Sequence, residues 1–278
     1  MTPDFVAIGH VTVDRFGAAV RPGGAALYAA VAAHRLGLSA AILTSHGEDF
    51  PLEAIPPQIE VVSVDAPATT VFEYGNVRDA GSQRLESIAR PLTNAHVPED
   101  WREAPLVLLA PVIDEVDAHL VTVFPEASLG AAAQGWLRSL TPDGDVVGPE
   151  WTPPAFLLGR LQTLVVSADD VRGQEAAALE WAQRVPVMAV TAGRAGALLY
   201  VNGDRYEVRP HRARQVDATG AGDVFAAALL IAYDRSGDAW EAAEAAACAA
   251  ALSIEGEGHA AVPDVAALEA ALADYRAR

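Results

Sequence analysis

The chain has 278 residues, of which 51% are hydrophobic, and one cysteine. This length allows one large α/β domain or two smaller ones with a sizeable core, and a single cysteine cannot form a disulfide within the chain. The formal net charge of -18 argues against nucleic acid or an anionic membrane as the main partner, because both carry negative charge.

Every basic residue is an arginine: the 19 lysine and arginine positions include no lysine. This composition excludes mechanisms with an obligatory lysine, such as those of P-loop nucleotide hydrolases, protein kinases, Schiff-base aldolases and pyridoxal-phosphate enzymes. Any phosphate that the chain binds must therefore be neutralised by arginine, by metal ions or by backbone amides. The histidines show no spacing typical of a zinc site.

The N-terminal segment has the pattern of an α/β fold. Residues 5–9 (FVAIG) are a short apolar run ended by glycine, which predicts a buried parallel strand. Residues 23–37 begin with two glycines, continue with alanine-rich turns and end at Gly37, which predicts a helix. Residues 40–45 (AAILTS) predict the next strand.

The pattern changes between about residues 58 and 90. Three β-branched runs (IEVVSVD, TTVFEYG and QRLESIA) are separated by short turn sequences, with no helix between them. This predicts an antiparallel patch. It has too little apolar material to be a domain, so we expect it to be a flap over one edge of the main sheet.

From residue 106 onward, predicted strands and helices alternate again. Such alternation indicates a mainly parallel sheet covered by helices on both faces. Ligands of such sheets bind at the carboxyl ends of the strands. The predicted strands are 106–112, 126–132, 163–167, 186–193 and 197–201, and the predicted helices are 173–185, 222–235, 238–254 and 264 to about 275.

A glycine-rich turn, DATGAGDVF, precedes one of these helices. Gly220 and Gly222 permit positive φ, so the backbone N–H groups from Gly220 through Ala221 to Asp223 can converge on one point. That point lies at a helix N-terminus, which favours an anion. The turn can therefore stabilise a phosphoryl group without lysine.

Asp223 lies in the first turn of the same helix, where it can accept a proton from a hydroxyl held beside it. A purely structural interpretation stays open from these residues alone. In that interpretation Asp223 caps the helix, and Asp217 and Thr219 form a local turn.

DATGAGDVFAAALL resembles the C-terminal motif of the ribokinase-like (PfkB) carbohydrate kinases. The resemblance implies a ribokinase-like α/β fold, with a mainly parallel sheet covered by helices on both faces and a small β lid. It implies a single domain over 1–278, to which about 11–22 and 58–90 contribute the lid. It also implies Asp223 as the catalytic base and the amides of Gly220, Ala221 and Gly222 as the anion hole.

Further stretches are similar to other motifs of this family. VAIGHVTVD and GGAALYAAVAAHRLG resemble the first strand and the double-glycine motif. VTAGRAGALLY and GEGHAAVP resemble the nucleotide-binding segments, and VVSADD stands at the family's metal-organising element. The resemblance thus implies Asp14, Gly23, Gly24 and Tyr28 at the substrate, Thr191, Gly193, Gly196, Gly258 and His259 at the nucleotide, and Asp170 at the metal.

Taken alone, these residues also have structural interpretations. Asp14 can be a solvated turn acid, the double glycine a helix entry, and TAGRAG a plain hairpin turn. Arg138 and Arg194 are candidate phosphate partners, but a surface position is the simpler interpretation of each.

Four positions depart from the family pattern. Ser167 and Asp170 replace an asparagine and a glutamate, so the carboxylate is one methylene shorter. Tyr28 stands where many members carry a sugar-binding asparagine, which argues against ribose and fructose. Ala228 replaces a glycine in the helix. TTVFE and QGWLR resemble the inositol-kinase-like branch.

We therefore expect an ATP-dependent kinase that phosphorylates a hydroxyl of a small sugar or a myo-inositol-like polyol and uses Mg²⁺. A nucleoside kinase and a non-catalytic sugar- or nucleotide-sensing protein are the alternatives. The resemblance also admits a monovalent cation and a homodimer through the lid. With no secretory pattern in the sequence, we expect a cytoplasmic protein.

Overall fold

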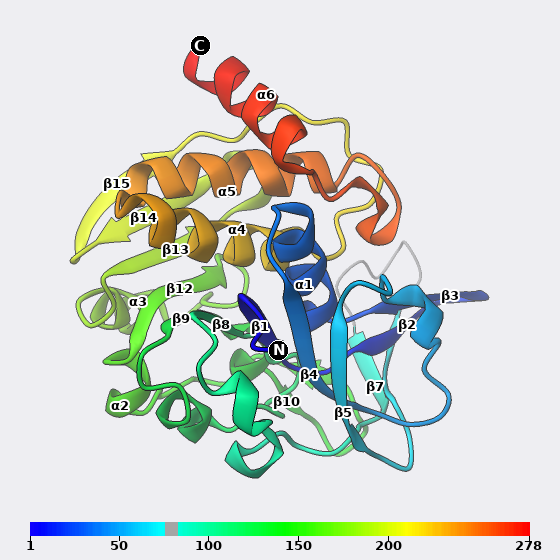
Figure 1. Cartoon of the computed structure of the whole chain (residues 1–278). Coiled ribbons are helices and arrows are strands. Elements are labelled where there is room, and N and C mark those ends of the chain that lie inside the picture. Colours follow the sequence, from blue (N-terminus) through cyan, green and yellow to red (C-terminus); the bar gives the residue numbers. More distant parts are fainter. Residues whose placement is uncertain (76–82) are drawn as a thin grey trace.

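The computed structural model describes residues 1–75 and 83–278. Its main feature is a nine-stranded sheet with the order β15-β14-β13-β12-β9-β8-β1-β4-β5 (Figure 1). All neighbours from β5 to β13 pair in parallel, and β14 and β15 are added antiparallel. The strands are β1 (Phe5–Ile8), β4 (Ala40–His46), β5 (Glu60–Asp65), β8 (Leu106–Leu109), β9 (Ser128–Ala132), β12 (Leu161–Ser167), β13 (Val187–Thr191), β14 (Ala197–Val201) and β15 (Asp204–Val208).

Helices cover both faces of this sheet, which confirms the predicted architecture. Alternate residues of a strand face opposite sides, so Phe5 of β1 packs into one core and Val6 into the other. The first core contains α1, α4 and α5, and the second contains α3 and the buried tryptophans Trp101, Trp136 and Trp181. The helices are α1 (Ala25–Arg35), α2 (Ala155–Leu158), α3 (Glu175–Ala182), α4 (Ala221–Ser236), α5 (Ala239–Ser253) and α6 (Val265–Arg276). Among the described residues, no helix is both long and apolar enough to cross a membrane.

The helix ends follow local sequence signals. Asp238 caps α5 by accepting hydrogen bonds from Trp240 and Glu241 N–H, and Asp264 caps α6 through Ala267 N–H. By contrast, α1 and α4 begin after glycines with positive φ rather than after capping side chains. The N–H groups at these two helix ends are therefore not satisfied by a capping side chain.

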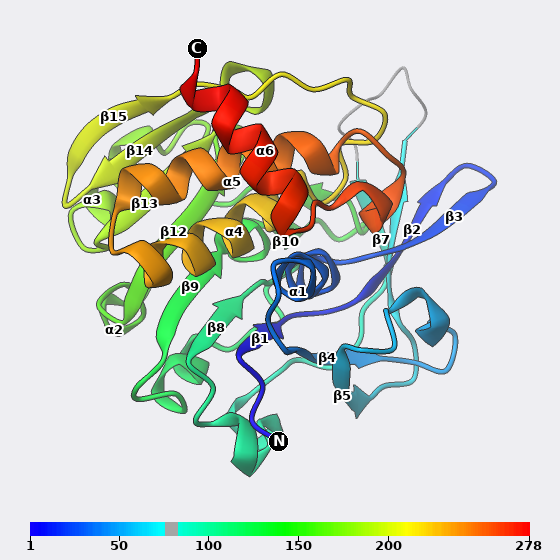
Figure 2. The ribbon, with the colours of Figure 1, turned by 45° about the horizontal axis from the view of Figure 1, so that its top comes forward.

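A second sheet of four strands lies beside the main one and is called the small sheet here. Its order is β3-β2-β6-β7, and its central pair β2/β6 is parallel while the outer pairs are antiparallel. Figure 2 shows the β2–β3 hairpin extending away from the main sheet. The strands are β2 (Thr12–Phe16), β3 (Ala19–Gly23), β6 (Thr70–Tyr74) and β7 (Gln83–Ser87).

The predicted pairing of the first β-branched run is wrong. β5 pairs in parallel with β4 at the edge of the main sheet rather than joining an antiparallel patch. The valines of β5 favour a strand, but the strand with which β5 pairs depends on the edge of β4 that lies beside it. The part of the expected lid that falls on residues 76–82 lies outside the described residues.

A further hairpin, β10 (Ser139–Leu140) and β11 (Val146–Val147), has no counterpart in the sequence predictions. The turn of this hairpin is hydrogen-bonded to the small sheet. Leu85 N–H donates to Gly144 O at 2.9 Å, and the backbones of Arg84 and Asp145 form an isolated antiparallel β-bridge. Short 3₁₀ segments complete the chain: η1 (Leu52–Ala54), η3 (Asn94–His96), η4 (Glu99–Trp101), η5 (Ala118–Thr122), η6 (Ala133–Leu137), η7 (Gly193–Ala195) and η8 (Gly258–Ala261).

Candidate active site

Two cavities lie beyond the carboxyl ends of the main-sheet strands, one on each side of the N-terminus of α4. One has a volume of about 260 Å³ and lies between the small sheet and α4; we call it the acceptor cavity. The other, of about 370 Å³, lies between the end of β13, α4 and α5; we call it the donor cavity. Gly220 and Asp223 line the first, and Ala221 and Gly222 line the second.

The glycine turn between the cavities is held open by its backbone. Gly220 has φ +76°, a left-handed conformation that glycine adopts without strain. Ala221 N–H donates to Ala218 O at 3.3 Å and Asp223 N–H to Gly220 O at 3.1 Å, so these two amides are occupied. Among the described residues, the N–H groups of Gly220 and Gly222 have no acceptor. These two amides, rather than all four of the turn, are available to an anion.

Asp223 lies at the wall of the acceptor cavity with charges on several sides. Burial raises its pKa to about 7, and the carboxylates of Asp170 and Asp14 act in the same direction. The Arg138 guanidinium, which also lines the cavity, acts to lower it. Asp223 is thus a carboxylate whose proton affinity suits acid–base chemistry near neutral pH.

Asp14 faces the same cavity from β2. It is 4% exposed, and Thr12 Oγ1 donates to its Oδ1 at 3.0 Å. Burial raises the pKa of Asp14 to about 6, against the hydrogen bond from Thr12 and the charge of Arg138. A buried, weakly hydrated carboxylate of this kind is a strong acceptor for a ligand hydroxyl.

The double glycine and Tyr28 pack tightly around this cavity. Gly24 and Tyr28 line it, and the Tyr28 ring lies against Gly220. A Cβ at Gly23 would come within 2.5 Å of Asp14 Oδ2, and one at Gly24 within 2.4 Å of His10 O. Gly23 therefore makes room for the Asp14 carboxylate, although it is not among the lining residues.

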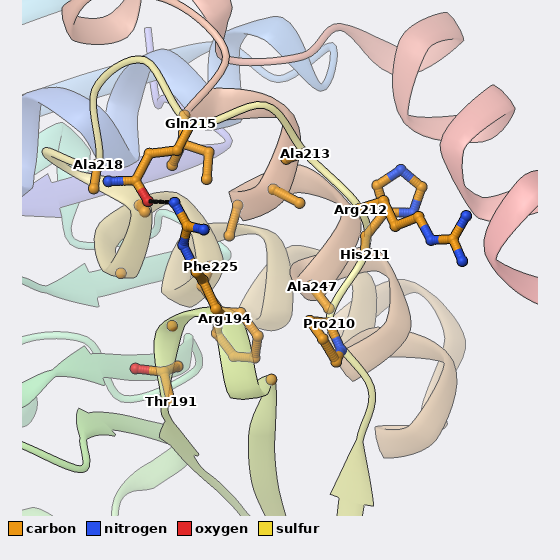
Figure 3. A pocket seen from close by; sticks show the side chains of 17 residues that line it. Thr191, Arg194, Pro210, His211, Arg212, Ala213, Gln215, Ala218, Phe225 and Ala247 are labelled. Carbon is orange, nitrogen blue, oxygen red and sulfur yellow. Dashed lines mark hydrogen bonds between the residues drawn. The ribbon is translucent and has the colours of Figure 1, made fainter.

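The donor cavity has a polar rim and an apolar floor. Thr191, Gly193 and Gly196 line it, as does Arg194, which donates to Gln215 Oε1 at 3.2 Å (Figure 3). Apolar side chains from α4, α5 and the residue after α5 form the floor: Phe225, Ala247, Ala250, Ala251 and Ile254.

Gly258 and His259 are the two expected nucleotide-binding residues that lie outside the lining of the donor cavity. Gly258 N–H donates to Asp217 Oδ2 at 3.1 Å, and the His259 ring packs edge-on against Tyr28 with Nε2 3.0 Å from Ala54 O. Their loop folds toward α1 and the acceptor side, because its backbone is tied to Asp217.

Asp170 follows β12 and is held by Ser167. Ser167 N–H donates to Asp170 Oδ2 and Asp170 N–H to Ser167 Oγ, each at 3.0 Å. Gln134 Nε2 approaches Oδ1 at 3.4 Å. Within the described part of the chain, no three acidic, histidine or cysteine side chains form a metal cage. One carboxylate near the turn fits Mg²⁺, which is commonly held by one or two carboxylates, water and substrate phosphates.

The chain matches the profile of the pfkB family of carbohydrate kinases over residues 122–265, just over half of its length. The chain belongs to this family. Membership of a carbohydrate kinase family is what the sequence predicted.

Curated relatives match the kinase only in part or weakly. An inositol 3-kinase of Oryza sativa subsp. japonica is 42% identical over 81 residues, which are 29% of this chain and 20% of the relative. The "Probable fructokinase-2" of Arabidopsis thaliana is 25% identical over 236 residues, 75% of this chain and 71% of the relative. The kinase thus matches about a fifth of the length of the rice inositol 3-kinase.

Solved structures match the kinase over nearly its whole length. A pyrophosphate-dependent kinase in the ribokinase family, complexed with a pyrophosphate analog and myo-inositol, gives a TM-score of 0.79 at 22% identity and covers 96% of this chain and 99% of that one. Arabidopsis thaliana ribokinase, complexed with ribose and ATP, gives 0.72 at 19% identity, with 98% and 99% covered. These similarities establish the ribokinase-like fold.

The sequence analysis missed several lining residues of the kinase. Arg138 was expected at the surface, yet it lines the acceptor cavity, donates to Val112 O at 3.2 Å and lies 5.8 Å from the Phe72 ring centroid. Its position in QGWLR, which resembles the inositol-kinase-like branch, was the only feature of the sequence that could have indicated a place for Arg138 in the site. The remaining missed residues are Thr12, Ala25, Phe72, Tyr74, Gln83, Val112, Gln134, Ala218 and Thr219 on the acceptor side, and Arg194, Pro210, His211, Arg212, Ala213, Gln215, Phe225 and the α5 residues on the donor side.

Proposed function

We propose that this kinase transfers the γ-phosphoryl group of ATP to a hydroxyl of a cyclic polyol of the inositol class. The observation that carries the proposal is the position of Asp223. Its carboxylate lines the acceptor cavity, while Gly222, one residue earlier, lines the donor cavity. A hydroxyl in the first cavity and a phosphate in the second would meet at this turn.

The chemistry follows from the groups around the turn. Asp223 takes the proton of the acceptor hydroxyl as that oxygen bonds to the γ-phosphorus and the bond to the β-phosphate oxygen breaks. The free N–H groups of Gly220 and Gly222 and the Arg138 guanidinium neutralise charge on the transferring group. Mg²⁺, near Asp170, would supply further neutralisation of the donor phosphates. Because the transition state is loose, positioning and charge neutralisation account for most of the acceleration.

The lining of the acceptor cavity supports a polyol. Asp14, Gln83 and Gln134 offer acceptors and donors to several hydroxyl groups, and Phe72 and Tyr74 offer apolar faces to ring C–H groups. Tyr28 gives no amide to the cavity. The partial identity to inositol 3-kinases adds support for an inositol over ribose or fructose.

The donor has a second candidate, pyrophosphate. The apolar floor of the donor cavity favours ATP, since it offers a surface for a purine base. Arg194 and Arg212 on the same cavity favour a compact polyanion, and three structural neighbours are described as pyrophosphate-dependent kinases or as a converted form of one. We favour ATP because inorganic pyrophosphate would leave the apolar floor unused.

We further propose that the small sheet acts as a lid on the acceptor, that residues 1–278 form one domain, and that the kinase works in the cytoplasm.

We also propose a homodimer through the small sheet. Phe16 and Val20 on the β2–β3 hairpin of this sheet are 37% and 61% exposed, which supports such an association. Sedimentation of the wild-type chain and of Val20→Asp tests this association. A monomer at every concentration contradicts it.

The test of the function is a matrix of donors and acceptors. Transfer is measured with ATP or pyrophosphate against myo-inositol, ribose, fructose and adenosine, with and without Mg²⁺. We expect the highest kcat/KM for ATP with myo-inositol. A higher value for ribose or fructose overturns the acceptor assignment, and a higher value for adenosine supports a nucleoside kinase. A higher value for pyrophosphate overturns the donor assignment. Binding of these ligands without any transfer supports the sensing alternative.

A further inference from the structure

Arg21 joins the small sheet to the glycine turn. It lies on β3, where its Cα is the cross-strand partner of Asp14 on β2. Directly opposed residues of an antiparallel pair place their side chains on the same face of the sheet. From that face, Arg21 Nη1 reaches Asp217 Oδ2 at 2.9 Å, and Nη2 lies 3.7 Å from Glu257 Oε1.

Asp217 is the fixed end of this contact. Its side chain is 11% exposed, and its Oδ1 accepts from Thr219 N–H at 3.0 Å and from Thr219 Oγ1 at 2.7 Å. Its Oδ2 accepts from Gly258 N–H at 3.1 Å as well as from Arg21. Burial acts to raise the pKa of Asp217, but these hydrogen bonds and the charge of Arg21 outweigh it and hold the pKa below its ordinary value.

The same arginine also touches an aromatic stack that reaches the acceptor cavity. The Arg21 guanidinium lies 5.6 Å from the Phe16 ring centroid, and Phe16 stacks on Tyr74 with centroids 4.5 Å apart. Tyr74 lines the acceptor cavity. Arg21 therefore reaches the wall of the cavity through Phe16 on one side and contacts Asp217, the acid bonded to the turn, on the other.

We propose that Arg21 is a positioning residue that fixes the β2–β3 hairpin, and with it Asp14, relative to the Gly220–Gly222 turn. The inference rests on the proposed roles of Asp14 and of the turn, and it adds a group that touches neither substrate. An exposed ion pair contributes little, but the Asp217 end of this one is partly buried and has two further hydrogen-bonding partners. The pair therefore constrains geometry more than a surface pair does.

Loss of this contact has a specific kinetic consequence. The hairpin carries Asp14 to the acceptor, so a detached hairpin weakens acceptor binding and leaves the turn open to water. The KM for the acceptor should then rise about 5-fold or more, the lower end of ordinary site-to-site coupling. The fraction of donor hydrolysed by water instead of transferred should rise with it, while the KM for the donor stays unchanged.

The chain offers a matched control on the same hairpin. Arg15 on β2 pairs with Glu86 on β7 at 2.8 Å, an ion pair inside the small sheet that does not reach the main body. The Arg15 side chain is 47% exposed and that of Arg21 is 40% exposed, so the two arginines are similarly accessible while their partners differ. Arg15→Gln thus removes an equivalent charge without breaking the contact with the turn.

The experiment compares wild type, Arg21→Gln, Arg21→Lys and Arg15→Gln. For each, acceptor KM, donor KM, the ratio of transfer to hydrolysis, and hydrogen exchange of the amides in 217–222 and 257–259 are measured. We expect Arg21→Gln to raise the acceptor KM, the hydrolysis of the donor and the amide exchange of both segments. In Arg21→Lys these values should lie close to those of wild type, because the positive charge is kept. Arg15→Gln should match wild type.

The exchange measurement separates this inference from the proposed function, because it needs no turnover. Faster exchange in Arg21→Gln alone supports the contact even if no acceptor in the panel is phosphorylated. If Arg21→Gln and Arg15→Gln give the same kinetics and the same exchange, Arg21 is an ordinary surface residue and the inference is overturned.

Discussion

The ring of Tyr28 lies directly on Gly220. A Cβ at Gly220 would come within 2.2 Å of two carbons of that ring, and the φ of Gly220 is +76°. Helix α1, which follows the double glycine, is therefore packed against the turn that precedes α4. Tyr28 acts on the turn by packing, in addition to its place in the acceptor cavity.

This contact predicts that Gly220→Ala destabilises the fold and removes activity. A left-handed alanine costs about 1–2 kcal/mol, and the overlap with Tyr28 adds to it. Gly222→Ala is the control for stability, since a Cβ there meets nothing within 4 Å and alanine favours a helix. Urea unfolding measures both. Equal stability of the two variants would contradict the packing argument.

Replacing Asp223 by asparagine should abolish most phosphoryl transfer while leaving the Kd for the donor nearly unchanged. A general base contributes roughly 10²–10⁴-fold to the rate. Asp234→Asn is the control. Asp234 lies in the last turns of the same helix, where it accepts a hydrogen bond from Ser128 Oγ far from the glycine turn. A near-normal kcat in Asp223→Asn would contradict its role as the general base and would leave it as an acidic residue at the end of the helix.

The same variant should be more stable than wild type at pH 8. The pKa of Asp223 is raised to about 7 in the folded protein, so its contribution to stability is lost as pH rises from its ordinary value toward 7. Asparagine has no such loss, and we expect a gain on the order of 1 kcal/mol at pH 8 that shrinks toward pH 5. Urea unfolding at both pH values tests this. A gain that is independent of pH would exclude the titration of Asp223 as its cause.

Activity should rise with pH through a midpoint near 7, since the base must be ionised. The charge of Arg138 holds the pKa of Asp223 down, so Arg138→Gln should move this midpoint to higher pH. Arg194→Gln, on the donor cavity, should change the rate without moving the midpoint. The measurement is kcat/KM at subsaturating donor from pH 5 to 9. A midpoint unmoved by Arg138→Gln contradicts the assignment.

Asp170 should set the metal requirement. Excess EDTA should abolish activity and Mg²⁺ restore it, and Asp170→Ala should raise the Mg²⁺ concentration for half-maximal rate by roughly 10–100-fold. Asp169→Ala is the control, because the neighbouring Asp169 is exposed and pairs with Arg172. Full activity in EDTA would remove the metal from the mechanism, and an unchanged Mg²⁺ dependence would remove Asp170.

The sequence predicted those features that are encoded within a few neighbouring residues, and it did not predict those that depend on contacts between distant segments. The alanine-rich helices, with their starts near Asp238 and Asp264, and the GAGD turn are encoded within a few residues, and the structure agrees with them. The partner of β5 and the place of Arg138 depend on contacts between distant segments. Arg138 follows a 3₁₀ segment and reaches the cavity only because its guanidinium bonds to Val112 after β8. Apart from the resemblance of QGWLR to the inositol-kinase-like branch, no periodicity or motif in the sequence indicates the position of Arg138.

The two cavities have almost no wall in common. Of the described residues, Ala218 alone lines both, and its methyl group offers little chemistry to either ligand. A substitution that changes the fit of the donor therefore leaves the acceptor site intact, and the reverse also holds. Donor preference and acceptor preference can diverge independently on such a scaffold.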